Sequence, residues 1–213
     1  MGVTIFGAGN MARGIGTRLV AAGESVTIID RTHEKAVALA DELRPQAKSG
    51  ATVKAAESGA PVQDDIVVLA LYYPVEKEVA NHYREQLAGK IVVEITNPLN
   101  ATFDDLATSP GVSAAEEIAW ILYDSKVVKA FNTTFAGTLV EGEVAGLPLD
   151  VFLAGDDADA KARLAAILTA AGLRPLDVGP LKRARQLEGL GLLHITQQAA
   201  LNTGFASAVK IVS

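Results

Sequence analysis

Three small residues near the start of the sequence have the spacing of a phosphate-binding turn. Gly7, Gly9 and Ala12 follow an apolar run and open a segment of helical periodicity, in the order G-x-G-x-x-A. The first glycine permits a tight turn, the second lets a pyrophosphate approach the backbone, and the small third residue lets the helix pack closely on the sheet. Free N–H groups at the start of that helix attract phosphate. The pattern predicts a dinucleotide-binding turn.

The residues after the next apolar run bear on which dinucleotide binds. Asp30 lies about 20 residues beyond the glycines, where a carboxylate accepts hydrogen bonds from the ribose hydroxyls of NAD. Arg31, Thr32 and Lys35 follow it, and their cationic and hydroxyl groups suit the 2′-phosphate of NADP. Asp30 could instead pair with Arg31 or Lys35, and Thr32 could cap a helix. We favour NADP and keep NAD as the alternative.

Polar or aromatic residues follow three further apolar runs. These residues are Tyr72, Tyr73 and Pro74, then Thr96, Asn97 and Pro98, and finally Asn132, Thr133 and Thr134. In an open parallel sheet, ligands bind outside the carboxyl ends of the strands, so the three groups are expected to line a pocket for a nicotinamide and a substrate. Each group also fits an ordinary turn.

Other kinds of catalytic or metal site find little support in the sequence. It contains no cysteine, which excludes disulfides, thiolate metal sites and a cysteine nucleophile. The three histidines, His33, His82 and His194, lack metal-ligand spacing, so no metal site is expected. The acidic pairs, Asp64-Asp65, Asp104-Asp105, Glu116-Glu117 and Asp156-Asp157, fit helix caps and solvated loops better than acid–base catalysis.

Composition indicates a globular protein with neither a nucleic-acid nor a membrane partner. Of 213 residues, 49% are hydrophobic and 21% charged, and the formal net charge is -6. An acidic chain is a poor partner for phosphate backbones and anionic membranes. No apolar run approaches the roughly 20 residues that span a bilayer. The first residues, up to Phe6, are typical of a strand rather than a signal peptide. We therefore expect a soluble, cytoplasmic protein.

Short apolar runs alternate with segments of helical periodicity along most of the chain. Strands are predicted at Val3–Phe6, Ser25–Ile29, Ile66–Leu71, Lys90–Ile95, Val127–Phe131 and Val151–Ala154. Helices are predicted at Asn10–Ala22, from Thr32 to Pro45, after Pro74 to about Leu87, at Ala114–Leu122, from Asp157 to Gly172, and from about Leu181 to Leu201.

This alternation predicts an α/β protein of the Rossmann type: a doubly wound parallel sheet with a small C-terminal α/β extension that ends in a long helix. The alternation loosens after Phe131. We therefore expect residues 1–135 to form the dinucleotide-binding domain and residues 136–213 to form a smaller domain that packs on the cofactor cleft.

Four longer stretches carry a resemblance to a known family. They are IFGAGNMARGIG from Ile5, VVKAFNTTFAG from Val127, LAGDD from Leu153 and GLRPLDVGPLKRARQLE from Gly172, and they span nearly the whole chain. With them the sequence resembles the NADP-dependent oxidoreductases of the deazaflavin coenzyme F420, and the related reductase domain of the six-transmembrane metalloreductases.

The resemblance implies a Rossmann domain with a small C-terminal domain, usually in a homodimer. It implies that Ala8, Gly9, Asn10 and Met11 hold the pyrophosphate and that Arg31 and Lys35 bind the 2′-phosphate. The expected cofactor-binding residues are Gly7, Ala8, Gly9, Asn10, Met11, Asp30, Arg31, Thr32, Lys35, Leu71, Tyr72 and Ala136. Asp30 replaces a small hydroxyl residue typical of the family, and Asn132 stands where some members carry histidine.

The implied reaction is direct hydride transfer between NADP(H) and the ring of a deazaflavin such as coenzyme F420, or of a flavin. Such a step depends on positioning and on exclusion of water, so it requires no catalytic base. No catalytic residue is assigned; the pocket candidates are Tyr73, Pro74, Asn97, Pro98, Asn132 and Thr133. Lys182, Arg183 and Arg185 either face an anionic coenzyme tail or form a solvated helix turn.

Two other functions remain open at this point. One is a non-catalytic NAD(P)-binding sensor or partner-binding module, because no unique catalytic residue identifies an enzyme. The other is a small hydroxyacid-type dehydrogenase. That class needs a large all-helical second domain with a catalytic lysine, which the pattern after Phe131 does not provide.

Overall fold

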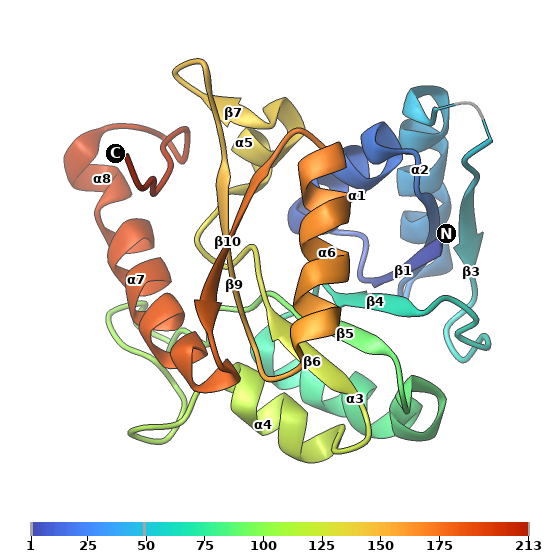
Figure 1. Cartoon of the computed structure of the whole chain (residues 1–213), viewed down its shortest axis with the longest axis horizontal. Helices are drawn as coiled ribbons and strands as arrows, with labels where there is room; N and C mark the ends of the chain where they lie inside the picture. The colour runs from blue at the N-terminus through green and yellow to red at the C-terminus, as the bar shows by residue number, and fades with distance from the viewer. Residues whose placement is uncertain (1, 49, 213) are drawn as a thin grey trace.

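A computed structural model describes residues 2–48 and 50–212, and its central feature is a sheet with the strand order β10-β9-β6-β5-β4-β1-β2-β3 (Figure 1). Its strands are β1 (Gly2–Phe6), β2 (Ser25–Ile29), β3 (Val53–Ala56), β4 (Ile66–Leu69), β5 (Ile91–Glu94), β6 (Lys126–Lys129), β9 (Asp150–Gly155) and β10 (Arg174–Gly179). β1 to β6 run parallel in the Rossmann order, β9 pairs antiparallel with β6, and β10 pairs parallel with β9. The predicted fold class is confirmed.

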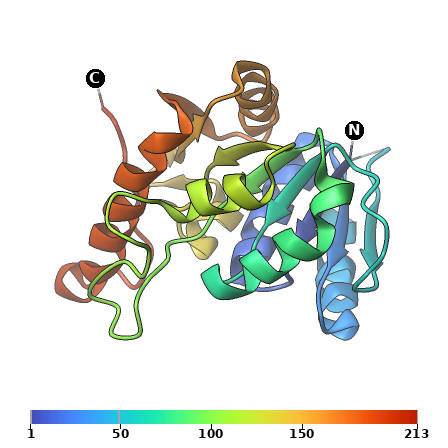
Figure 2. The same ribbon diagram turned by 90° about the horizontal axis from the view of Figure 1, so that it is seen from below.

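Helices cover both faces of this sheet, as the two perpendicular views show (Figures 1 and 2). They are α1 (Asn10–Ala22), α2 (His33–Leu43), α3 (Tyr73–Leu87), α4 (Ala114–Ile121), α5 (Ala136–Glu141), α6 (Ala158–Ala170), α7 (Ala184–Thr196) and α8 (Gln198–Leu201). Short helical turns η1 (Arg44–Gln46) and η2 (Leu181–Arg183) and a hairpin of β7 (Glu143–Val144) and β8 (Leu147–Pro148) complete the elements.

Strand residues alternate between two hydrophobic clusters, one on each face. In β4, Ile66 and Val68 pack with the cluster that includes α1, α2 and α6, whereas Val67 and Leu69 pack with the cluster of α3 and α4. Because side chains in a strand point alternately to opposite faces, a continuous apolar run is what a strand covered on both sides requires.

Several predicted boundaries differ from the structure. β3 and β10 are additional strands; both are the outermost strands of the sheet and are poor in large apolar residues. The predicted strand Ile66–Leu71 ends at Leu69, where the chain turns toward α3. The predicted final helix forms as η2, α7 and α8. Within the described residues, no helix is both long enough and apolar enough to span a membrane.

Three helix ends show how the caps are formed. Gly23 ends α1 in a left-handed conformation (φ 90°), and the Asp157 carboxylate accepts a hydrogen bond from the Ala160 N–H at the start of α6. Thr32 occupies the N-cap position of α2, but its side chain makes no capping bond, so that predicted bond is wrong.

Candidate functional site

Two adjoining cavities lie at the carboxyl ends of β1 and β4, where the order of the strands reverses. One has a volume of about 460 Å³ and the other of about 530 Å³. They share Gly9, Ala70, Leu71 and Tyr72, and so form one continuous cleft. The reversal point of a doubly wound sheet is the expected ligand site of this fold.

The glycine turn lies at the junction of the two cavities. Gly7 has φ 105°, and a β-carbon there would overlap the carbonyl oxygen of Ala70, so only glycine fits. A β-carbon on Gly9 would meet nothing within 4 Å, which leaves open space at the start of α1. In the described structure no side chain caps α1, so the N–H groups of its first turn remain available to a phosphate.

Asp30 is held by the backbone around the glycine turn. One carboxylate oxygen accepts a hydrogen bond from the Ala8 N–H at 2.9 Å, and the other accepts one from the Thr32 N–H at 2.8 Å. The carboxylate therefore ties β2 to the turn after β1. This contact with the turn is the one that sequence reasoning did not anticipate for Asp30.

The smaller cavity carries the charged residues expected for a 2′-phosphate. Arg31, Thr32 and Lys35 line it together with Asp30, and the side chains of Arg31 and Lys35 lie in a solvent-exposed rim. A doubly negative phosphate beside a guanidinium and an ammonium gains charge-assisted hydrogen bonds.

The larger cavity has apolar and aromatic walls. None of its lining side chains is a lysine, arginine, histidine, aspartate or glutamate. Its polar groups are Asn10, Thr96, Asn97, Asn132 and Thr134, and its aromatic rings are Tyr72, Tyr73, Phe103, Phe131, Phe135 and Phe205.

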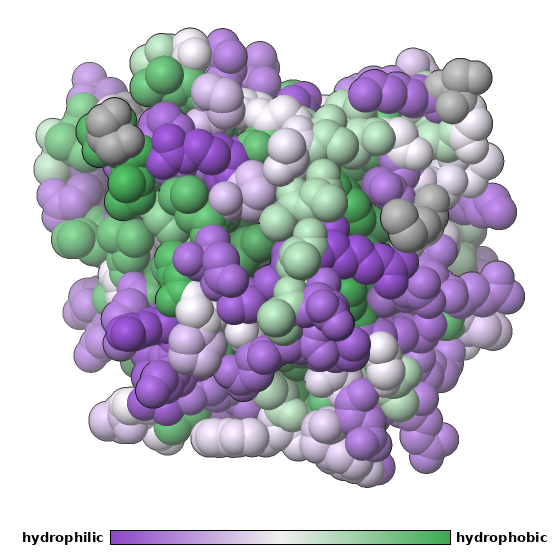
Figure 3. Space-filling view, viewed as in Figure 1, coloured by the Kyte–Doolittle hydropathy of each residue, from purple (hydrophilic) through white to green (hydrophobic). Residues whose placement is uncertain are grey.

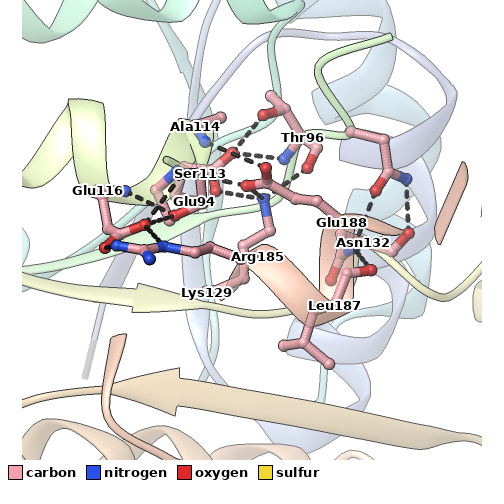
Figure 4. A network of polar contacts seen from close by, with 12 residues as sticks. Glu94, Thr96, Ser113, Ala114, Glu116, Lys129, Asn132, Arg185, Leu187 and Glu188 are labelled. Carbon is pink, nitrogen blue, oxygen red and sulfur yellow. Dashed lines mark hydrogen bonds and ion pairs between the residues drawn. The ribbon is translucent and has the colours of Figure 1, made fainter. Parts of the chain in front are cut away.

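Two asparagines fix the inner end of the larger cavity. Asn132 donates to the Asn97 side-chain oxygen at 2.9 Å and to the Leu187 carbonyl at 2.7 Å, and Asn97 donates to the Asn132 carbonyl at 2.7 Å. The contacts join the loops after β5 and β6 to α7 (Figure 4). Helix α7 approaches closely because Gly191 faces the Asn97 amide, where a β-carbon would overlap it.

A buried ionic cluster lies beneath these asparagines. Lys129 is fully buried and donates to Glu94 at 2.6 Å, to Glu188 at 2.8 Å and to the Thr96 carbonyl at 2.6 Å (Figure 4). Burial alone would lower the pKa of Lys129, but the two carboxylates outweigh it and raise the pKa, so the ammonium stays charged.

The second carboxylate of the cluster also caps a helix. Glu188 accepts hydrogen bonds from the N–H groups of Ala114 and Ala115, in the first turn of α4, at 3.2 and 3.5 Å. The positive end of the helix stabilises this buried negative charge. Burial nevertheless raises the pKa of Glu188 above its ordinary value.

Glu76, on α3, joins the same cluster as a third buried carboxyl group. The Thr96 hydroxyl contacts Glu94 at 2.5 Å and Glu76 at 3.1 Å. A hydroxyl has one hydrogen, and the shorter contact with Glu94 takes it. Glu76 lies beside the Glu94 carboxylate in this buried site, which favours the neutral form of Glu76. Burial, and next the charge of Glu94, raise the pKa of Glu76 to about 10.

Tyr73 belongs to a half-exposed polar cluster behind the wall of the larger cavity. Its hydroxyl donates to Glu117 on α4 at 2.6 Å and accepts from Lys77 at 2.9 Å. Burial, and next the bond to Glu117, raise the pKa of Tyr73. The hydroxyl is thus engaged with α4, while the residue itself lines the cavity.

The structure brings together most of the residues proposed from the sequence. Gly7, Ala8, Gly9, Asn10, Met11, Asp30, Arg31, Thr32, Lys35, Leu71, Tyr72, Tyr73, Asn97 and Asn132 line one cavity or both. Pro74, Pro98, Thr133 and Ala136 line neither: Pro98 and Thr133 are buried behind the wall, Pro74 is exposed in the first turn of α3, and Ala136 begins α5. Lys182, Arg183 and Arg185 line neither as well, and Arg185 pairs with Glu116.

Sequence reasoning missed the outer wall of the larger cavity. Leu99 and Phe103 come from the loop between β5 and α4, Phe135 precedes α5, and Ile195 and Phe205 come from the C-terminal part of the chain. The sequence held one indication of this wall: it places phenylalanines in segments expected to be loops. A large apolar side chain in a loop is not needed for the core.

Comparisons with known proteins identify relatives over nearly the whole chain. The family described as NADP oxidoreductase, coenzyme F420-dependent, matches residues 2–98. The F420-dependent NADP reductase of Methanocaldococcus jannaschii is 30% identical over 193 residues, which cover 86% of this chain and 86% of that protein. A solved structure from Arthrobacter sp. FB24, described as a candidate F420-dependent NADP reductase, is 29% identical with a TM-score of 0.82 and covers 99% of both chains.

A longer protein is similar as well. The metalloreductase STEAP3 of Rattus norvegicus is 32% identical over 190 residues, or 89% of this chain. The chain spans 36% of the length of that metalloreductase.

Proposed function

The chain belongs to the family of coenzyme F420-dependent NADP oxidoreductases, and we propose that it transfers a hydride between NADP(H) and a deazaflavin or flavin-type acceptor. The observation that carries this proposal is the continuous cleft formed by the two cavities at the glycine turn. One half has basic groups and the other is aromatic and uncharged. NADP would pass from one cavity to the other beside Gly9, Leu71 and Tyr72, and would meet the acceptor inside the larger cavity.

The smaller cavity is proposed to hold the adenosine half of NADP. Arg31 and Lys35 would bind the 2′-phosphate, and the first turn of α1 would bind the pyrophosphate. Asp30 would keep the turn in shape, because its carboxylate joins Ala8 to Thr32. The Asp30 carboxylate would repel a nearby 2′-phosphate, and the positive charges of Arg31 and Lys35 would have to offset this repulsion.

The larger cavity is proposed to hold the nicotinamide and the acceptor ring. When bound, these rings supply the hydride donor and the hydride acceptor. The chain itself positions the rings and excludes water: Asn97 and Asn132 fix the inner end, and apolar residues form the walls. Hydride transfer between two rings depends on their distance and orientation, and this arrangement would supply both.

A hydroxyacid dehydrogenase is disfavoured by the same lining. Oxidation of an alcohol requires a group that takes up the hydroxyl proton. The described lining of the larger cavity contains no carboxylate, histidine or lysine, and Lys129 is fully engaged in the cluster beneath it. A non-catalytic sensor differs from the proposed enzyme by binding without turnover.

Steady-state assays test the proposal directly. NADPH is mixed with coenzyme F420, FMN or FAD, and oxidation is followed by the nicotinamide absorbance. We expect turnover with at least one acceptor and a lower KM for NADPH than for NADH. Tight NADPH binding without turnover with any of the three would support the sensor and reject the enzyme.

We further propose that residues from 136 onward act as the smaller domain, which completes the acceptor end through Ile195 and Phe205.

A homodimer is proposed from the family resemblance. Apolar side chains gather over α8 and the end of α7 (Figure 3), where Leu193 and Leu201 are more than half exposed. Light scattering would measure the mass; a monomer at micromolar concentration would reject the dimer.

A further inference from the structure

Three phenylalanines of the larger cavity share an unusual backbone conformation. In the described chain the non-glycine residues with positive φ are Phe103, Phe131, Ala145, Asn202 and Phe205. The three phenylalanines have φ of 59°, 61° and 64°, and all three line the larger cavity. A left-handed backbone is unfavourable for a residue with a bulky side chain, and such residues concentrate at functional sites.

Each of these backbones is held in place by a polar side chain. In the turn that carries Phe103, the Asn100 side-chain oxygen accepts a hydrogen bond from the Asp104 N–H. The Thr134 hydroxyl donates a hydrogen bond to the Phe131 carbonyl at 2.7 Å. The buried Gln198 accepts the Phe205 N–H at 3.2 Å. The three segments are far apart in the sequence. Two of these local arrangements present accessible rings at one cavity, those of Phe103 and Phe205, whereas the Phe131 ring is buried in the core.

The outer two rings are accessible, and the Phe205 ring also packs against another aromatic side chain. Phe103 is 63% exposed and Phe205 is 52% exposed, although both line the cavity. Phe205 meets Phe135 edge-on at 5.0 Å, and Phe135 stacks on His194 at 4.3 Å. Neither Phe103 nor Phe205 lines the smaller cavity, so the exposed rings belong to the end of the cleft away from the basic groups.

We propose that Phe103 and Phe205 form an aromatic clamp that binds the uncharged planar ring of the hydride acceptor by stacking, while Phe131, which is buried in the core, supports the inner wall of the cavity. The proposal rests on the proposed function and names the class of substrate for this cavity: a planar heteroaromatic ring. Aromatic faces bind such rings by offset stacking or edge contacts. Because the described lining carries no charged side chain, the cavity recognises the ring rather than a charged substituent.

Binding without turnover tests the clamp. Riboflavin serves as the probe because its ring is planar and uncharged, and its fluorescence reports binding in the absence of NADPH. Phe103→Leu and Phe205→Leu keep apolar bulk and remove the aromatic face. We expect each to raise the riboflavin Kd by about 3- to 10-fold, the range of a lost aromatic contact. The Kd of NADPH should stay within about twofold.

Tyr123→Leu is the matched control. Tyr123 is an exposed aromatic residue that follows α4 and lines neither cavity. Its replacement should leave both affinities unchanged. Unchanged riboflavin affinity in both phenylalanine variants would overturn the clamp, as would an equal loss of NADPH affinity, which would assign the rings to the nicotinamide.

Glycine variants separate binding from folding. Phe103→Gly removes the ring from a left-handed position that glycine adopts freely. We expect weaker riboflavin binding with a melting temperature no lower than that of the wild type. A lower melting temperature together with unchanged affinity would assign Phe103 a structural role and reject its part in the clamp.

The same experiment distinguishes failure of the clamp from failure of the proposed function. Riboflavin binding that depends on the two rings, without turnover with coenzyme F420, FMN or FAD, supports the clamp and rejects the enzyme. Turnover with ring-independent affinity rejects the clamp alone. If riboflavin does not bind and no acceptor is turned over, both the clamp and the proposed enzyme are rejected.

Discussion

Replacing Glu76 by glutamine tests whether a neutral carboxylic acid is part of the fold. Glu76 is fully buried, and its pKa is raised from 4.5 to about 10. The stability contributed by the neutral form is fully present below pH 4.5, declines as pH rises, and is lost by about pH 10. Each pH unit in this window corresponds to roughly 1.4 kcal/mol. The glutamine side chain of the variant has the same shape and titrates nowhere in the window.

The wild type should therefore lose stability relative to the variant as pH rises. The unfolding free energy of Glu76→Gln minus that of the wild type should increase by about 4 kcal/mol between pH 5.5 and pH 8.5. Urea unfolding followed by circular dichroism at three pH values gives this difference. Glu85→Gln, on the exposed face of the same helix, removes the same charge from a site in water. An infrared carbonyl band of a neutral acid at pH 8, absent from the variant, would identify the group. Parallel pH curves for wild type and Glu76→Gln would refute the assignment.

Four further substitutions address the cleft and the ionic cluster beneath it. Arg31→Ala should weaken NADPH binding by about 10- to 100-fold and NADH binding much less, as one charge-assisted hydrogen bond predicts; equal losses in titrations would dismiss the 2′-phosphate contact. Asp30→Ser removes the bracket between Ala8 and Thr32 and should weaken NADPH and NADH alike; tighter NADPH binding alone would show that charge repulsion dominates. Lys129→Met leaves two buried carboxylates unpaired and should cost about 3–5 kcal/mol of unfolding free energy, against less than about 1 kcal/mol for an exposed control such as Lys54→Met. Gly191→Ala displaces the Asn97 amide and should raise the acceptor KM more than the NADPH KM.

Local pattern was sufficient to predict the glycine turn and the central strands. The glycine turn directly follows the apolar run of β1 and opens α1, and strands buried on both faces leave an unambiguous signal. Strands β3 and β10 were missed because outer strands need little apolar surface; β10 even contains Pro175 and Asp177. A strand assignment for RPLDVG depends on a partner that the segment itself does not specify.

The buried cluster was beyond sequence reasoning for a different physical reason. A lysine inside an apolar strand is tolerated only when carboxylates neutralise it, and Lys129 finds one of them, Glu188, 59 residues away. The common position of the three left-handed phenylalanines at one cavity also depends on segments that are far apart in the sequence. Phe205 is a central residue of the turn that the Ala206 N–H closes on the Thr203 carbonyl, and Gln198 and Phe135 hold this turn at the cavity.

These two features depend on each other through α7. The hydrophobic cluster beneath this helix has few buried members, Phe152, Ala154 and Leu187, and apolar contacts of that size resist sliding poorly. Directional bonds supply the missing register: Lys129 and the first turn of α4 hold Glu188, and Asn132 holds the Leu187 carbonyl. A shift of one helical turn would break all of them at once and would carry the C-terminal segment, with its ring, away from the cavity. The costly buried charges thus fix the position of the outer wall of the larger cavity, which explains why polar anchoring is used at this interface in place of a larger apolar one.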